Sequence, residues 1–203
     1  QSQIDPDTGR VYRLRGKGLP LEKDRDLSAK STSELIALLK HPNKWHRQVA
    51  VRLLGEGKDE KGQLALRKLV KNGADREALC ALWAHYQAFG LDDKLVVTAL
   101  SREYPPLRLW AVRLACDDLG FSHKHPVAGL RDSLGSRKDP QARLSPDFFQ
   151  SLLSQARIEP YAEVRSQMAA SARRLPSDQA LSLTHILLTR EEDLDDPFLP
   201  LML

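Results

Sequence analysis

The sequence predicts an all-α fold in which helical hairpins stack one after another in a row, an α-solenoid. The first indication is an internal repeat: RQVAVRLLGE, residues 47–56, returns as RLWAVRLACDDLG from residue 108, with the letters AVRL in the same register 61 residues later. The second is a recurring pair of apolar-faced helical segments, about 30 residues for each pair. A pair of that length cannot bury its apolar face alone, so neighbouring pairs must share one core.

Composition narrows the class of protein. The chain has 203 residues, 41% of them hydrophobic and 29% charged, which is typical of a globular protein. Its net charge of +4 is spread along the chain, unlike the concentrated cationic stripe of a dedicated nucleic-acid binder. No apolar run approaches the ~18 residues of a membrane span. Cys80 and Cys116 lie in apolar helical patterns, so we expect two buried free thiols.

The N-terminal part differs from the rest. GRVYRLRGKG, residues 9–18, predicts a short β-like run, and because one strand is not stable alone it must be the exit strand of an upstream sheet or an arm lying on the helices. We therefore assign residues 1–30 to this exit strand plus a linker, and 31–203 to the helical array. The polar start without methionine and the apolar ending DDPFLPLML lead us to expect an excerpt of a longer protein with a truncated C-terminus.

The first hairpin is predicted over residues 33–56. SELIALLK forms its first helix, with Ser33 or Thr32 as the N-cap, and the proline of HPN separates it from a second helix. Gly55 or Gly57 ends that second helix.

Two further hairpins follow with the same pattern. EKGQLALRKLVKN pairs with DREALCALWAHYQAFG, and DDKLVVTALSRE pairs with PPLRLWAVRLACDDLG. Arg47, Arg76 and Arg108 occupy corresponding places at the start of the second helices, separated by 29 and 32 residues. The repeated AVRL is therefore two steps of an array whose middle copy has diverged.

Residues 119–145 interrupt the array, and we expect an insertion loop with a short helical turn. The pattern resumes with a hairpin formed by SPDFFQSLLSQAR and PYAEVRSQMAASARRL, in which Arg165 occupies the position of the recurrent arginine. PSDQALSLTHILLTR then forms the first helix of a final hairpin, and the start of its second helix follows. The second helices also share small residues that permit close approach: Ala50, Ala111, Ala169 and Ala172. The whole predicts about four to five hairpins of the HEAT-like (armadillo-like) type.

Several stretches resemble one region of a known bacterial family. These are GRVYRLR, the proline-containing linker, LSAKSTSELIALLKHPNKWHRQVAVRLLGE, EVRSQMAASARRLP and DDPFLPLML. They are similar to the HEAT-repeat region of large planctomycete and verrucomicrobia proteins described as haem-binding CxxCH or membrane-bound dehydrogenase-like proteins. The resemblance covers nearly the whole chain.

The resemblance implies a multidomain parent protein. Members of that family place a β-propeller before the solenoid and a c-type haem module after it, which implies that GRVYRLR is the propeller's exit strand and that the parent is periplasmic or otherwise extracytoplasmic. This chain contains no CxxCH and no propeller, so the family's redox activity transfers to none of its residues. We expect no cofactor in this segment.

For the other candidate sites we expect structural or surface roles rather than metal binding or catalysis. His123 and His125 form the closest histidine pair, but a metal ion needs further ligands that the adjacent sequence does not offer. We expect the remaining histidines, at positions 41, 46, 85 and 185, to be caps or surface residues. An acidic cluster is expected to be a solvated turn rather than a catalytic pair; its members are Glu191, Glu192, Asp193, Asp195 and Asp196.

The recurrent arginines are the main candidate site. The arginine row comprises Arg47, Arg76, Arg108 and Arg165, with Arg52 and Arg113 nearby. Such a row either binds carboxylates and carbonyls of neighbouring repeats or lies on a concave face and meets an acidic partner or phosphate. We favour the structural role.

We therefore predict a non-catalytic scaffold that binds a protein partner or neighbouring domains of its own chain, with nucleic acid and membrane insertion disfavoured. The rival is a HEAT-like DNA-binding enzyme resembling the alkylation-repeat DNA glycosylases, which the sequence pI of about 9.1 and the aligned arginines keep open. A third possibility is an electron-transfer docking surface for the redox modules of the parent.

Overall fold

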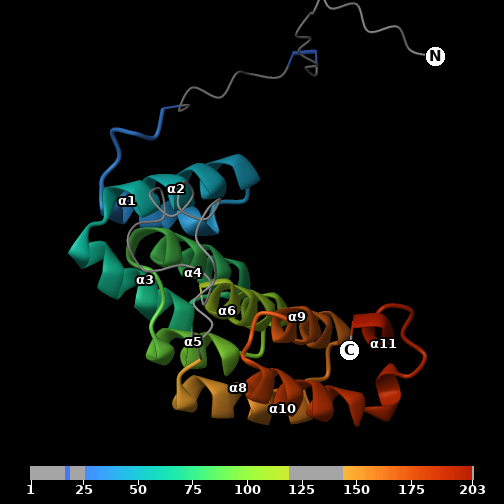
Figure 1. The fold of residues 1–203 in the computed structure, drawn as a ribbon. Coiled ribbons are helices and arrows are strands. Elements are labelled where there is room, and N and C mark those ends of the chain that lie inside the picture. Colours follow the sequence, from blue (N-terminus) through green and yellow to red (C-terminus); the bar gives the residue numbers. More distant parts are fainter. Residues whose placement is uncertain (1–16, 19–25, 119–143, 203) are drawn as a thin grey trace, which may run out of the picture.

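The computed structural model describes residues 17–18, 26–118 and 144–202 (Figure 1). Within these ranges the ordered elements are all helical and no strand occurs, which confirms the predicted all-α class. The β-like run expected within 9–18 falls almost wholly outside the described residues, as do the two histidines of the SHKHP stretch and nearly all of the insertion expected at 119–145.

The described helices follow the predicted order. They are α1 (Thr32–Ala37), α2 (Lys44–Gly57), α3 (Glu60–Asn72), α4 (Asp75–Phe89), α5 (Asp93–Leu100), α6 (Pro105–Asp118), α8 (Pro146–Ile158), α9 (Ala162–Ala172), α10 (Ser177–Leu188) and α11 (Leu199–Met202), with 3₁₀ turns η1 (Leu38–Lys40) and η2 (Glu191–Asp193). No described helix combines the length and the apolarity that crossing a membrane requires.

The helices form two layers along one row (Figure 1). One layer contains α1, α3, α5, α8 and α10, and the other contains α2, α4, α6, α9 and α11; within each layer every helix packs on the next. The layers meet where α1 packs on α2, α3 on α4, α5 on α6 and α9 on α10. Segments α1–α2 and α10–α11 therefore lie at opposite ends of the row.

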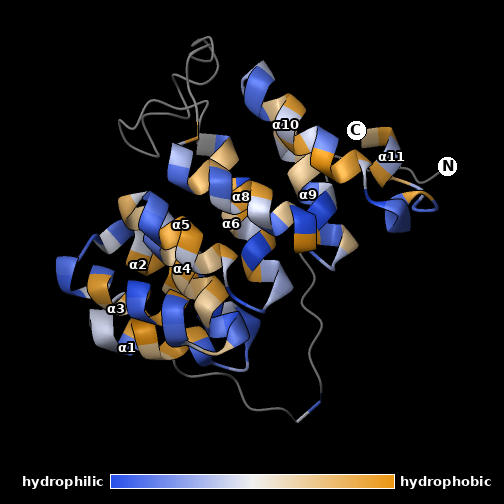
Figure 2. Ribbon diagram, turned by 90° about the horizontal axis from the view of Figure 1, so that it is seen from below, coloured by the Kyte–Doolittle hydropathy of each residue, from blue (hydrophilic) through white to orange (hydrophobic). Residues whose placement is uncertain are grey.

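One apolar core runs the length of this arrangement. Its buried residues extend from Leu27 to Leu199 and include members of every described α-helix, and hydrophobic and hydrophilic positions alternate along the ribbons of these helices (Figure 2). Small residues bring the helices of the second layer close together, because Ala50, Ala111 and Ala169 have at most 1% of their surface exposed. A Cβ added at Gly55 would lie 2.7 Å from the Gln87 Cβ, so α2 and α4 approach closely there.

One helix end corrects a sequence expectation and another confirms one. The N-cap of α1 is Ser31, not Ser33 or Thr32: the Glu34 backbone N–H donates to Ser31 Oγ (3.4 Å) and the Ser31 N–H donates back to Glu34 Oε2 (2.8 Å). This reciprocal capping box satisfies two N–H groups, which a cap two residues later could not do. The C-terminal end of α2 agrees with one of the two predicted alternatives: Gly57 is its last residue, and Gly55 lies inside the helix.

The two cysteines are buried and free, as expected. Burial raises the pKa of the Cys116 thiol to about 12, so this side chain is an inert thiol in the core. Not every apolar residue of the helical segments is buried: α3 turns Leu66 and Val70 inward, whereas Leu64 is 73% exposed.

Candidate functional site

Three members of the arginine row occupy the same place in their helices. Arg47, Arg108 and Arg165 are each the fourth residue of α2, α6 and α9. Their Nη1 atoms donate to backbone carbonyls five or six residues earlier: Arg47 to His41 (2.6 Å) and Pro42 (2.7 Å), Arg108 to Arg102 and Glu103 (2.7 Å each), and Arg165 to Glu159 (2.8 Å). These guanidinium groups thus satisfy carbonyls in the turn that precedes each helix.

Two of these arginines also bind a carboxylate from the next hairpin along the chain. Arg108 Nε donates to Glu159 Oε2 (2.7 Å) and its Nη2 to Oε1 (2.6 Å). Arg165 Nε donates to Asp193 Oδ2 (2.7 Å), and its Nη2 binds the second oxygen. Both pairs are nearly inaccessible, with side chains at most 6% exposed. Bidentate pairs of this kind fix geometry as well as charge, so they connect α6 to the turn before α9 and α9 to η2.

Arg76 departs from the pattern. It is exposed and makes no hydrogen bond or ion pair within the described part of the chain. The carbonyls that it would be expected to reach are held instead by Arg102, whose Nη1 donates to Val70 (3.2 Å) and Lys71 and whose Nη2 donates to Gly73 (2.7 Å). The same role is therefore performed at this step by an arginine from the following hairpin.

Arg52 and Arg113 lie at the surface and are paired within their own helices. Arg52 binds Glu56 at 2.8 Å, with both side chains at least 58% exposed. Arg113 lies 3.6 Å from Asp117 and stacks over the ring of Trp110, with its Cζ atom 4.9 Å from the ring centroid. The structure therefore does not gather the six arginines into one cationic surface.

The electrostatics agree with this geometry. Burial alone raises the pKa of Glu159, but the hydrogen bonds from Arg108, from Gln155 Nε2 and from the Tyr161 backbone N–H outweigh it, so the pKa is lowered. The hydrogen bond to Asp193 raises the pKa of Arg165. These shifts favour the charged forms of Glu159 and Arg165, and the hydrogen-bonding groups of both pairs are directed at each other rather than at a ligand.

Two of the histidines expected to be caps or surface residues are buried: His85 is a cap, as one alternative predicted, whereas the burial of His46 corrects the prediction. His46 is 4% exposed and His85 is 1% exposed. His85 Nδ1 lies 3.0 Å from the Gly90 carbonyl at the end of α4, and burial lowers its pKa, so the ring is a neutral cap. Over the described residues, no group of three histidine, cysteine or acidic side chains could hold a metal ion.

The acidic turn is also not simply solvated, which corrects that prediction in part. Asp193 is 5% exposed and bound to Arg165, Glu192 binds Arg190, and Asp196 accepts the N–H groups of Phe198 and Leu199 at 2.9 and 2.8 Å. These carboxylates have structural roles: Asp193 pairs with Arg165, Glu192 pairs with Arg190, and Asp196 caps the start of α11.

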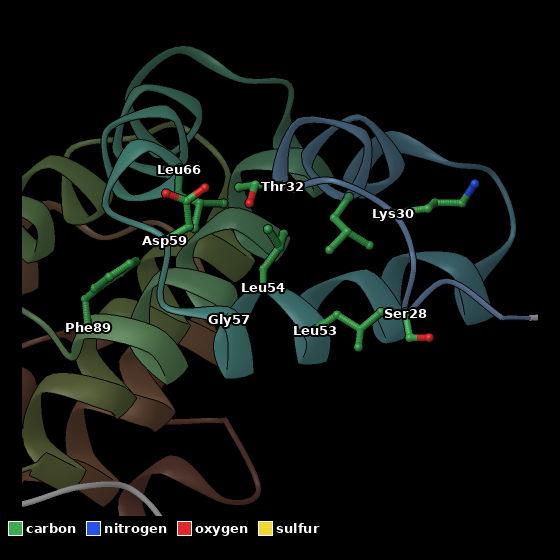
Figure 3. Close-up of a pocket in the computed structure, with 10 residues that line it drawn as sticks. Ser28, Lys30, Thr32, Leu53, Leu54, Gly57, Asp59, Leu66 and Phe89 are labelled. Atoms are coloured by element: carbon green, nitrogen blue, oxygen red, sulfur yellow. The ribbon is translucent and has the colours of Figure 1, made fainter.

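A pocket lies where α1, α2, α3 and α4 meet (Figure 3). Its volume is about 180 Å³, below the roughly 300 Å³ at which small-molecule sites begin. Leucines and Phe89 form half of its lining residues, and Asp59 is its carboxylate. Asp59 Oδ1 accepts the Lys61 N–H at 3.0 Å as the N-cap of α3, and a hydrogen bond with Thr32 lowers its pKa. The Asp59 carboxylate therefore serves as the N-cap of α3 rather than as a reacting group.

Sequence reasoning missed Arg102, Arg190 and Glu159. Arg190 repeats the behaviour of Arg102, because its Nη1 donates to the carbonyls of Ala156 (3.0 Å) and Arg157 (2.7 Å) at the end of α8. Glu159 and Asp193 lie in the chain segments that precede α9 and α11, next to the arginine of the preceding helix in the same layer. No local spacing in the sequence singles them out, because each pairs with an arginine 51 or 28 residues earlier.

Comparison with known proteins adds no relative. No family model, no curated protein and no solved structure matches this chain.

Proposed function

We propose that this chain is a HEAT-type α-solenoid that serves as a non-catalytic interaction scaffold. The observation that carries the proposal is that two members of the arginine row bind groups inside the protein. Arg108 and Arg165 are 4% exposed and donate their hydrogen bonds to carboxylates and carbonyls of adjoining hairpins. Contacts of this kind, repeated from one two-helix unit to the next, are what stacked repeats need in order to hold a fixed curvature.

Fixed curvature is useful for presenting a surface. A row of hairpins offers an extended face whose shape does not depend on a ligand, and binding there relies on exposed aromatic anchors rather than on reacting groups. Tyr161, 46% exposed beside the buried Arg108–Glu159 pair, is such an anchor; the Arg108 Cζ atom lies 5.6 Å from its ring centroid. The family resemblance suggests the partners: a propeller and a c-type haem module of one parent protein.

Mixing the purified chain with such a propeller or haem module tests the proposal. We expect association measurable by calorimetry that weakens at least tenfold in Tyr161→Ala. Leu64→Ala is the control, since Leu64 is also exposed (73%) but lies on α3 in the other layer. Binding to neither module, or binding that ignores Tyr161→Ala, would contradict the proposal.

The rival DNA-binding function makes a separate prediction. Duplex binding depends on counterion release by a contiguous set of cations, so it must fall steeply with salt. Arg52 and Arg113 are paired with carboxylates, and Arg108 and Arg165 are buried, so we expect no mobility shift of duplex DNA at moderate salt. A tight shift at low salt that disappears in Arg52→Ala/Arg113→Ala would favour the rival.

A further inference from the structure

The first step of the arginine row lacks the carboxylate that two later steps have. Arg47 has the same helix position as Arg108 and Arg165, and its Nη1 donates to carbonyls of the preceding turn in the same way. In the two later arginines, the Nε–H and Nη2–H groups bind both oxygens of one carboxylate. Within the described residues Arg47 binds no carboxylate, so these two groups have no acidic partner there.

The sequence of the neighbouring segment explains the missing carboxylate. Glu159, the partner of Arg108, is the C-cap of α8 and precedes the next helix of the second layer. The corresponding residue beside α2 is the C-cap of α3, Gly73, which has no side chain. A Cβ built there would lie 2.6 Å from the Leu69 carbonyl oxygen, so the backbone excludes a side chain at this place. The position that provides the carboxylate to Arg108 cannot provide one to Arg47.

A second arginine lies near the same place. Arg76, the second residue of α4, is exposed and has no ion-pair partner in the described part of the chain. The charges of Arg47 and Arg76 both act on the buried Cys80 thiol of α4, so both guanidinium groups lie near this point of the α2–α4 contact. Burial raises the pKa of that thiol and outweighs the opposing effect of Arg47, so the thiol is neutral and balances neither charge.

We propose that Arg47 and Arg76 bind a carboxylate side chain of an acidic segment in a partner protein. The Nε–H and Nη2–H groups of Arg47 hold the carboxylate as those of Arg108 hold Glu159, and Arg76 adds a second positive charge. A carboxylate is the expected ligand because a planar guanidinium group matches it bidentately, and because two equivalent arginines of this chain bind one. The inference rests on the proposed scaffold function for the existence of a protein partner, and it adds the chemistry of that partner.

The surrounding charges favour a protein segment over nucleic acid. Lys44, in the first turn of α2, is exposed and extends the positive charge beyond Arg47. Asp75 and Glu77 adjoin Arg76 in the sequence and form no ion pair with either arginine among the described residues. Two acidic groups oppose a polyanion such as duplex DNA, which needs a contiguous set of cations, more than they oppose one docked carboxylate.

Titration of the ¹⁵N-labelled 203-residue chain with an acidic peptide tests the proposal. The probe is the hexapeptide EEDLDD, which has the sequence of residues 191–196 and includes the aspartate that Arg165 binds; QQNLNN is the control peptide. We expect EEDLDD, but not QQNLNN, to move the Arg47 Nε–H resonance, with a dissociation constant of about 1 mM or below that rises with salt. The corresponding resonances of Arg108 and Arg165 should stay in place, because each is already bound to a carboxylate.

Two substitutions locate the site. Arg76→Glu should weaken EEDLDD binding at least fivefold, and since Arg76 is exposed, circular dichroism should show an unchanged helical content. Arg47→Lys retains the charge but not the bidentate geometry, so it should also weaken binding. Arg52→Glu is the matched control: Arg52 is an exposed arginine of α2 that is already paired with Glu56, so binding should change less than twofold.

Three results would overturn the proposal. The first is an Arg47 resonance that EEDLDD does not move at concentrations up to about 10 mM, or that QQNLNN moves equally. The second is an Arg47 Nε–H that exchanges as slowly as that of Arg108 without peptide, because an acidic group of the chain would then already occupy the place. The third is duplex DNA that binds more tightly than EEDLDD and is released by Arg76→Glu. None of these results concerns association through Tyr161, so they are distinct from a failure of the proposed function.

Discussion

The buried pair Arg108–Glu159 permits a quantitative test of the arginine row. Glu159 is fully buried and accepts four hydrogen bonds, two of them from Arg108. Glu159→Leu leaves the Arg108 guanidinium charged and 4% exposed with only two carbonyl acceptors. Breaking a buried pair in this way costs about 3–5 kcal/mol of unfolding free energy. Arg108→Met should cost a similar amount, since it strands the carboxylate.

The double variant separates pairing from burial. Arg108→Met/Glu159→Leu removes both charges, and the remaining cost is that of the groups left unpaired. These are the carbonyls of Arg102 and Glu103, Gln155 Nε2 and the Tyr161 N–H, about 1–3 kcal/mol together because all of them are only part-buried. We therefore expect the double variant to be more stable than either single one.

Urea unfolding followed by circular dichroism measures these differences, with unchanged m-values required for the comparison. Arg52→Met is the matched control: its ion pair with Glu56 is exposed, so the loss should stay below about 0.5 kcal/mol. Single variants that lose less than about 1 kcal/mol, or a double variant that loses the sum of both, would refute the reasoning.

Three further predictions concern other parts of the row. Arg102→Ala should destabilise the protein by about 1.5–3 kcal/mol because three carbonyl hydrogen bonds are lost, whereas Arg76→Ala should change stability by less than about 0.5 kcal/mol; equal effects in urea unfolding would show that Arg102 does not replace Arg76. The hydrogen bond from Arg67 lowers the pKa of Asp92 to about 2, so the ionised Asp92 contributes fully to stability above about pH 4, and this contribution is lost as the pH falls through 2. Melting temperatures measured from pH 5 to 2 should therefore fall less steeply in Arg67→Met than in the parent chain. Parallel curves would contradict this. Gly55→Ala should cost about 1–3 kcal/mol in the same unfolding assay, because the new Cβ meets Gln87, whereas Gly57→Ala, with open space around it, should be nearly neutral.

The order of helices could be predicted from the sequence because local chemistry determines it. Glycine and proline mark most turns, and apolar residues at helical spacing mark the buried faces, so the expected helices lie within a few residues of the observed ones. The N-cap of α1 was predicted one or two residues late, although Ser31 and Glu34 carry the capping-box spacing.

The contacts between hairpins were harder to predict because they join residues far apart in the chain. The replacement of Arg76 by Arg102 depends on which side chain reaches the end of α3, and that follows from packing between hairpins rather than from spacing within one. The burial of His46 had a local signal: it precedes Ala50 and Leu54 by four and eight residues, and all three are buried on one face of α2.

The most direct test of the central claim, that the recurrent arginines act inside the protein, is solvent exchange of their Nε–H protons measured by NMR on ¹⁵N-labelled chain. In Arg108 and Arg165 this proton is donated to a buried carboxylate, whereas Arg52 is exposed at the surface. We predict slow exchange for the first two, unchanged by inorganic phosphate or duplex DNA, and fast exchange for Arg52. Exchange in Arg108 and Arg165 as fast as in Arg52, or resonances that move when phosphate is added, would contradict the account.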